Sequence, residues 1–299
     1  LDIDHPDIEH FVSWKMNEEQ KVAALVAGSK ICDLFLNTIM KIAADGGTDR
    51  HTNPDLDIAI KRALARGVPM NYIVRVLQMV KMGYDHIDFK TFDTHYEGEA
   101  YQTVAGQNSN NTVRVTNEFM NAVIEDKEWD LTWRTSKKVA KKVKAKHLWN
   151  QINLSAWASA DPGLQYDTTI NQWHTCPADG RINASNPCSE YMFLDDTACN
   201  LASINLAHFL NEETGEFDIE GYKHAARLWT ITLEISVLMA QFPSRQIAQR
   251  SYDFRTLGLG YANIGTLLMV LGIPYDSPKA LAITGALTAI MCGESYATS

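Results

Sequence analysis

Segments with the side-chain pattern of a strand alternate with helical segments along much of this chain. Thr112–Val115 and Thr256–Tyr261 read as short strands, and the second is followed by a helical run at Asn263–Val270. Apolar residues recur every three or four positions in Tyr222–Phe242, which predicts an amphipathic helix that ends before Pro243. Alternating strands and helices favour a parallel α/β fold, and the pattern alone does not distinguish an open sheet from a barrel.

The other elements expected from the pattern are spread over the whole chain. Thr116 precedes Glu118 and an apolar stripe, which is the signature of a helix N-cap. A turn at Asp161-Pro162-Gly163 follows a helix that runs to about Ala160. Further helices are expected at Asp7–Trp14, within Glu18–Ile42, at Leu56–Arg66 and at Met70–Met82. Further strands are expected at Ile87–Phe92, Thr103–Gln107, Leu164–Ile170 and Ala184–Phe193.

The composition restricts the classes of function. A formal net charge of −9 argues against a general nucleic-acid-binding surface, but it does not argue against binding of single nucleotides. The longest apolar stretch, near Ile264–Ile273, is too short to span a bilayer, so no membrane association is expected. The five cysteines are scattered through 299 residues, which is unlike a disulfide framework and indicates a reducing cytoplasm.

One short motif places three chemically complementary side chains close together. In the sequence Asn186-Pro187-Cys188-Ser189-Glu190, an extended strand would point the amide, the thiol and the carboxylate toward the same side. Such a row could bind a polar substrate and move protons. A single cysteine is more often an inert packing residue, so the motif alone is a weak signal. A second thiol, Cys199, follows eleven residues after Cys188 and favours redox chemistry.

The segments around this motif resemble the active-site region of ribonucleotide reductases, and most closely the adenosylcobalamin-dependent (class II) kind. The resemblance includes the motif itself and its continuation, Y-M-F-L-D-D-T-A-C-N-L-A-S-I-N-L. It extends in the family's order from one end of the chain almost to the other. The further segments are D-H-P-D-I-E at Asp4–Glu9, G-Q-N-S-N-N-T-V-R-V-T at Gly106–Thr116, W-A-S-A-D-P-G at Trp157–Gly163, the run that begins at Asp167, and R-T-L-G-L-G at Arg255–Gly260.

The resemblance implies a fold and a radical mechanism. Residues 1–299 would form part of a ten-stranded α/β barrel, with the key cysteine on a central finger loop. Cys188 would become a thiyl radical when the cobalt–carbon bond of adenosylcobalamin breaks, and it would abstract the 3′-hydrogen of the ribonucleotide. Glu190 would accept the 3′-hydroxyl proton as general base, while Asn186 would orient the ribose hydroxyls. Cys199 would be one thiol of the reducing pair.

The same resemblance implies several partners. The substrate would be a ribonucleoside diphosphate or triphosphate, and a thioredoxin-like or glutaredoxin-like protein would restore the reducing thiols. A nucleotide effector and a homodimer are expected for the full enzyme. The chain begins at Leu1 and not at methionine, and we expect it to be the central piece of a longer protein. The partner thiol of Cys199, the substrate-phosphate loop and the C-terminal cysteine pair would then lie outside it, so turnover by this piece alone is not expected.

Three alternatives compete with this interpretation. The large subunit of a reductase that uses a metal-bearing partner subunit shares the Asn-Cys-Glu motif, whereas glycyl-radical reductases generally lack the thiol represented by Cys199. The chain could also be a non-catalytic fragment that docks with missing segments. A zinc site formed by His174, Cys176, Cys188 and Cys199 is disfavoured, because the cysteine spacings are unlike the close pairs of structural zinc sites.

The remaining cysteines and a glycine-rich stretch are expected to be structural. Cys32 and Cys292 lie in helical contexts and are read as packing residues, and Cys176 as a half-exposed loop thiol. The glycines at Gly258, Gly260 and Gly265 miss the spacing of the dinucleotide-binding fingerprint. Close packing of the backbone at a strand–helix turn explains them better.

Overall fold

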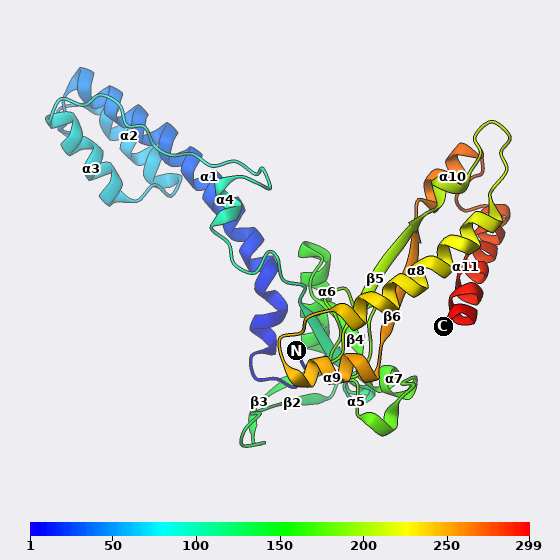
Figure 1. Cartoon of the computed structure of the whole chain (residues 1–299). Coiled ribbons are helices and arrows are strands. Elements are labelled where there is room, and N and C mark those ends of the chain that lie inside the picture. Colours follow the sequence, from blue (N-terminus) through cyan, green and yellow to red (C-terminus); the bar gives the residue numbers. More distant parts are fainter. The chain divides into compact units, whose positions relative to one another are not determined.

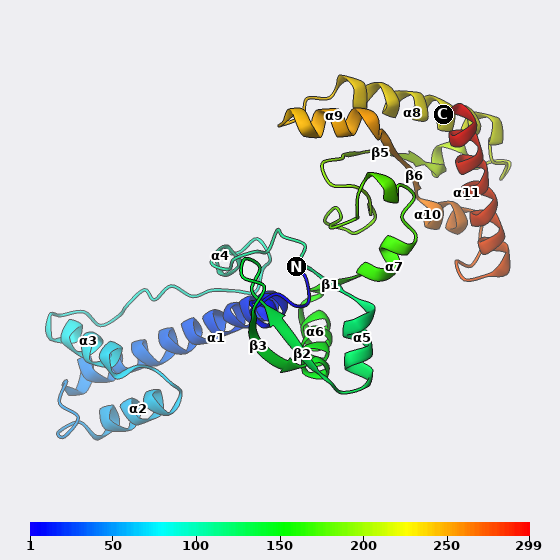
Figure 2. The same cartoon turned by 90° about the horizontal axis from the view of Figure 1, so that it is seen from below.

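The computed structural model describes all residues from 1 to 299 and divides the chain into two compact units, Leu1–Thr169 and Ile170–Ser299. Figures 1 and 2 show the elements of each unit from two directions. Three two-stranded sheets are present, two of them parallel and one antiparallel. The α/β prediction is therefore confirmed, whereas no closed barrel is seen.

A long helix organises the first half of unit 1. Helix α1 (Ile8–Gly46) contains both helical segments expected there, and α2 (Pro54–Ala65) and α3 (Met70–Lys81) pack beside its C-terminal half (Figure 1). The side chains of these three helices form one buried cluster around Leu36. Asn53 caps α2 by accepting a hydrogen bond from the Leu56 backbone N–H at 3.1 Å.

The second half of unit 1 is a small α/β arrangement. Strand β1 (Thr112–Val115) pairs in parallel with β4 (Gly163–Tyr166), and the last three residues of β1 are buried. As predicted, the Thr116 side chain caps the helix after β1 by accepting a hydrogen bond from the Phe119 N–H at 3.3 Å. The other elements of this part are α4 (Glu99–Gln102), α5 (Asn117–Ile124), the antiparallel strands β2 (Glu128–Thr132) and β3 (Val139–Lys144), and α6 (Ala145–Ser159).

Unit 2 is built around the second parallel pair. Strand β5 (Cys199–Asn205) and strand β6 (Thr256–Ala262) align along seven residues, with Cys199 opposite Thr256. Helix α8 (Ile219–Met239) contacts both strands, and its expected extent is confirmed to within a few residues. The other elements are α7 (Asp167–Gln172), which begins in unit 1, the short helices Pro177–Asp179 and Leu206–Phe209, α9 (Arg245–Asp253), α10 (Ile264–Val270) and α11 (Pro278–Thr298).

Two predicted strands in unit 1 are wrong, and a third, Leu164–Ile170, is a strand only as far as Tyr166 and continues as helix α7. Ile87–Phe92 runs beside α1, where side chains take the place of a partner strand. Asn37 of α1 bonds both backbone groups of Ile87, accepting from the N–H at 2.9 Å and donating to the carbonyl at 3.0 Å. Thr103–Gln107 forms turns and no strand, despite its β-branched residues. Local pattern fails at both places because a strand needs a neighbour that the sequence does not reveal.

Two helices meet the length and hydropathy criteria for crossing a membrane. They are α1 and α11, and core helices of soluble proteins meet the same criteria. The buried residues of α1 belong largely to the cores of unit 1, including Val22, Leu36 and Met40. Helix length and composition are therefore weak evidence for a membrane span here.

Candidate functional site

The Asn-Pro-Cys-Ser-Glu motif lies in a loop of unit 2, and the strand predicted at Ala184–Phe193 is wrong. The Ser189 N–H donates to the Asn186 carbonyl at 3.1 Å, which closes a turn over Pro187 and Cys188. Proline fits the second position of such a turn, and Ser189 adopts a left-handed φ of 66°. A single antiparallel bridge between Ser185 and Met192 joins the two sides of the loop.

This turn separates the side chains that the sequence placed in one row. Cys188 is exposed at the turn and does not line the neighbouring cavity. Asn186 and Glu190 do line that cavity, which has a volume of about 450 Å³, and Cys199 lines it as well. The structure thus brings three of the four predicted site residues to one pocket, with Cys188 between two of them in sequence.

The thiol of Cys199 sits where the pocket meets the β5–β6 pair. Burial, and to a lesser degree the negative charge of Glu190, raise the pKa of Cys199 above its ordinary value. The thiol is therefore held protonated, as a thiol that gives up a hydrogen atom or a proton during a reduction needs to be. Glu190 thus lines the same pocket as Cys199 and acts on its thiol electrostatically.

A glycine makes room for this thiol. A Cβ atom on Gly258 of β6 would lie 2.5 Å from Leu201 Cδ2 and 3.2 Å from Cys199 Sγ. Side chains from β5 therefore cross directly over the Gly258 backbone. The expectation of close packing at the glycine-rich stretch is confirmed for this position, although the contact lies within the strand and not at its end.

Tyr191 is a residue of this pocket that the sequence did not single out. Its hydroxyl lies 2.8 Å from Thr197 Oγ1 and 3.0 Å from Thr256 Oγ1. Its backbone N–H donates to the Asn186 Oδ1 atom at 2.9 Å. In the sequence, only its place directly after Glu190 could have pointed to Tyr191. Its two threonine partners are six and sixty-five residues away.

Cys176 lies apart from the pocket and is half-buried, in agreement with the prediction of a loop thiol. Its backbone N–H donates to His174 Nδ1 at 3.5 Å, and the His174 ring meets Phe193 edge to face. The chain contains no group of three or more His, Cys, Asp or Glu side chains arranged to hold a metal ion. Cys32 is half-buried against the helical core of unit 1, whereas Cys292 is exposed on α11.

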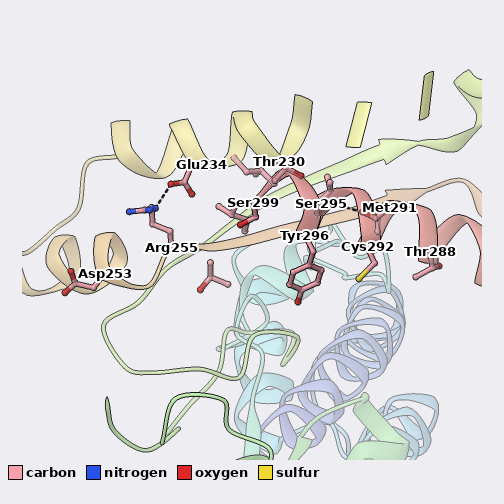
Figure 3. A pocket seen from close by; sticks show the side chains of 14 residues that line it. Thr230, Glu234, Asp253, Arg255, Thr288, Met291, Cys292, Ser295, Tyr296 and Ser299 are labelled. Atoms are coloured by element: carbon pink, nitrogen blue, oxygen red, sulfur yellow. Dashed lines mark hydrogen bonds and ion pairs between the residues drawn. The ribbon is translucent and has the colours of Figure 1, made fainter. Parts of the chain in front are cut away.

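A larger cavity of unit 2, about 660 Å³, lies among α8, β6 and α11 (Figure 3). Arg255 and Glu234 form an ion pair on one side of it, and Cys292 and Tyr296 project from α11 on the other. None of the four predicted site residues lines it. Size alone therefore points away from the four predicted site residues.

Comparison with known proteins gives one family. Residues 75–299 match the family described as ribonucleotide reductase, barrel domain. A vitamin B12-dependent ribonucleotide reductase from Agrobacterium fabrum is 60% identical over 305 residues, which covers 100% of this chain and 24% of the relative. The enzyme of the same name from Bradyrhizobium diazoefficiens is 58% identical over an equal length.

More distant relatives carry similar names. A vitamin B12-dependent ribonucleoside-diphosphate reductase from Thermoplasma acidophilum is 31% identical over 73% of this chain. The chain spans about a quarter of the length of the curated relatives it matches along its full length. Membership in a family of soluble enzymes also supports a soluble protein. The matched barrel-domain residues and the full coverage of the chain by close relatives show that it belongs to the ribonucleotide reductase family.

Proposed function

We propose that the whole protein reduces ribonucleotides to deoxyribonucleotides by a thiyl-radical mechanism that depends on a vitamin B12 coenzyme. The observation that carries the proposal is the shared pocket of Asn186, Glu190 and Cys199 beside the turn of Cys188, in a chain of this family. The names of the relatives support the coenzyme. Residues 1–299 would contribute part of a ten-stranded barrel, and the turn of Cys188 would be its central finger loop.

The proposal gives each site residue one role in the reaction. Cys188, as a thiyl radical, takes the 3′-hydrogen of the ribose and later returns it. Glu190 accepts the 3′-hydroxyl proton as a general base. Asn186 uses its Oδ1 atom to hold the Tyr191 backbone, so its Nδ2 group is the donor that can orient a ribose hydroxyl.

The reduction needs two electrons, which a pair of thiols supplies. Cys199 is one of them, and its burial keeps it protonated until it reacts. As the 2′-hydroxyl leaves as water, the two thiols become a disulfide, so atoms and electrons balance. A thioredoxin-like or glutaredoxin-like protein then reduces that disulfide. The second thiol of the pair would come from outside residues 1–299.

The exposure of Cys188 bears on whether a large coenzyme can reach it. The side chain of Cys188 is exposed at a turn, so a large group can approach its sulfur, which a buried thiol would prevent. When bound, adenosylcobalamin supplies a carbon radical by cleavage of its cobalt–carbon bond, and this chemistry suits an exposed thiol. The side chain of Cys188 fits the coenzyme in this respect.

The wider setting of the enzyme follows from the same proposal. The substrate is a ribonucleoside diphosphate or triphosphate, and a nucleotide effector and a homodimer belong to the complete enzyme. The reaction takes place in the cytoplasm, where thiols stay reduced.

A segment exchange tests this function. The part of the Agrobacterium fabrum reductase that aligns with this chain is replaced by residues 1–299, and deoxyribonucleotide formation is measured with adenosylcobalamin and dithiothreitol. We expect activity that needs the coenzyme and no second protein subunit. A soluble, folded exchange enzyme that stays inactive with the coenzyme, or that is active without it, would contradict the proposal.

A further inference from the structure

Tyr191 connects the turn of Cys188 with the strand pair that carries Cys199. Its hydroxyl contacts Thr197, two residues before Cys199, and Thr256, which is paired with Cys199 across the sheet. Thr197 lies in the loop just before the strand of the reducing thiol, and Thr256 lies on the neighbouring strand. The tyrosine hydroxyl therefore binds to the structural frame of Cys199 at two points.

The hydrogens of these hydroxyl groups can be assigned once the choice at Thr256 is made. Its hydrogen can go to the Tyr191 oxygen at 3.0 Å or to the Phe254 carbonyl at 3.4 Å, and the shorter contact is the stronger hydrogen bond. The Thr197 hydroxyl donates to the Leu194 carbonyl at 2.6 Å, so its oxygen is left to accept. Tyr191 can then donate to Thr197 while it accepts from Thr256, which gives a chain of three hydroxyl groups ending on a carbonyl. Hydrogen bonds in such a chain strengthen one another.

The backbone of Tyr191 makes the second connection. Its N–H donates to the Asn186 side chain at 2.9 Å, while the preceding residue is Glu190. Tyr191 thus holds the side chain of Asn186 and directly follows Glu190. Its hydroxyl also contacts the two threonines on either side of Cys199. A tyrosine that served only to fill the core would need one hydrogen-bond partner for its hydroxyl. It would not need one partner just before β5 and a second on β6, on two sides of the same thiol.

We propose that Tyr191 is a positioning residue, whose hydroxyl holds the turn of Asn186, Cys188 and Glu190 at a fixed place relative to the thiol of Cys199. The catalytic purpose of this positioning rests on the proposed reductase function. The positioning itself can be measured on the chain without turnover. An experiment can therefore reject the positioning role of Tyr191 without rejecting the reductase function, and the reverse.

The first measurement is the alkylation rate of individual cysteines. The chain is treated with iodoacetamide, and modification of Cys199 is followed by peptide mass spectrometry. Loss of the hydroxyl in Tyr191→Phe frees the turn to open, which exposes Cys199 and moves Glu190 away from it. Both changes raise the reactivity of the thiol, and we expect the rate at Cys199 to rise by about threefold to tenfold, the change in an opening equilibrium that one hydrogen bond produces. Cys32, in the helical core of unit 1, is the internal reference.

Two further variants separate positioning from a general loss of stability. Thr256→Val keeps the shape of the side chain and removes the hydroxyl partner, so it should raise the Cys199 rate as well. Combined with Tyr191→Phe it should add little, because both changes break one chain of hydrogen bonds. Tyr261→Phe is the matched control, since its hydroxyl also contacts a threonine, Thr288 at 2.7 Å, and it should leave Cys199 unchanged.

The outcome is decisive in either direction. An unchanged Cys199 rate in both Tyr191→Phe and Thr256→Val would overturn the proposal. Equal increases at Cys199 and Cys32 would also overturn it, because they would show global loosening. In the exchange enzyme, Tyr191→Phe should lower kcat with little change in KM, since the hydroxyl acts through the placement of the reacting groups. If that enzyme is inactive even with Tyr191 intact, the reductase function fails while the alkylation result stands.

Discussion

The two parallel strand pairs of the chain have the same geometry but different surroundings. In β1–β4, three successive residues of β1 are buried, and the Arg114 side chain donates to Asp167 Oδ1 at 2.7 Å and to Gln165 Oε1 at 3.0 Å. In β5–β6, most residues are half-buried, and Cys199 faces an open pocket. Parallel pairing alone therefore does not indicate where chemistry takes place.

The polar side chains of the two strand pairs also differ, because those of β1–β4 are buried and those of β5–β6 are accessible. The charges of Arg114 and Asp167 are largely buried and compensate each other, with 7% and 12% of their side chains exposed. Such a pair contributes to structure only while both partners are present. The neutral thiol of Cys199 and the carboxylate of Glu190 instead line a cavity, where a substrate can reach them. A buried ion pair is thus characteristic of β1–β4, which has a structural role. Polar groups that a substrate can reach are characteristic of β5–β6, which carries the candidate site.

The largest expected effect on stability comes from breaking the buried ion pair. Arg114→Ala leaves Asp167 as a buried charge without its main partner, and we expect a loss of about 3–5 kcal/mol in the free energy of unfolding of unit 1. Urea titration followed by circular dichroism measures it. Lys142→Ala is the control, because its ion pair with Asp130 is exposed and should contribute less than about 1 kcal/mol. A small effect at Arg114, or an altered alkylation rate at Cys199, would weaken the distinction between the two pairs.

A smaller effect is expected from a methyl group in the reactive pair. Gly258→Ala places a Cβ atom 3.2 Å from the Asn200 backbone oxygen and 3.2 Å from Cys199 Sγ, and the exposed Leu201 side chain must turn away. The tight contact with the fixed backbone should cost about 1 kcal/mol. It should also change the alkylation rate of Cys199, whose sulfur is displaced. Gly260→Ala tests the same strand at a position where the nearest atom, Ser203 Oγ, is 4.0 Å away. That control should be neutral or slightly stabilising, and equal destabilisation by both variants would refute the steric explanation.

The smallest expected effect is a change in the free energy of unfolding at alkaline pH, which comes from the Cys199 thiol. Burial raises the pKa of Cys199 above its ordinary value of 9.0 in the folded chain, so the unfolded chain loses this proton first as the pH rises. The stability that the thiol contributes is present below 9.0 and is lost as the pH rises through the folded pKa. Because the thiol is partly solvated, we expect less than about 1 kcal/mol. The difference between the wild type and Cys199→Ser should shrink at high pH, and a difference that grows there would show the opposite shift.

Much of the fold could be predicted because it depends on local pattern. The apolar repeat of α8 and the N-cap at Thr116 are determined by neighbouring residues. The β-branched pattern at Thr112–Val115 also predicted a strand correctly, although its partner β4 is distant in sequence. Ile87–Phe92 has a strand-like pattern, but Asn37 satisfies its backbone from a helix fifty residues away. A contact at that separation leaves no trace in the local sequence.

The sequence named the residues of the candidate site, but it did not predict how they are arranged. The resemblance identified Asn186, Cys188, Glu190 and Cys199, and the assignment of their roles stays a prediction. The extended row failed because Pro187 and the left-handed Ser189 form a turn. Tyr191 was missed, since its role depends on threonines that only the folded chain brings to its hydroxyl.

The most direct test of the central claim is a single substitution in the exchange enzyme. Cys188→Ser replaces the thiol by a hydroxyl, which does not readily form or transfer the radical, and deoxyribonucleotide formation should fall to background. Cys176→Ser, at a half-buried thiol outside the pocket, should retain most of the activity. Deoxyribonucleotide formation by a folded Cys188→Ser enzyme at a rate near that of the parent would contradict the account.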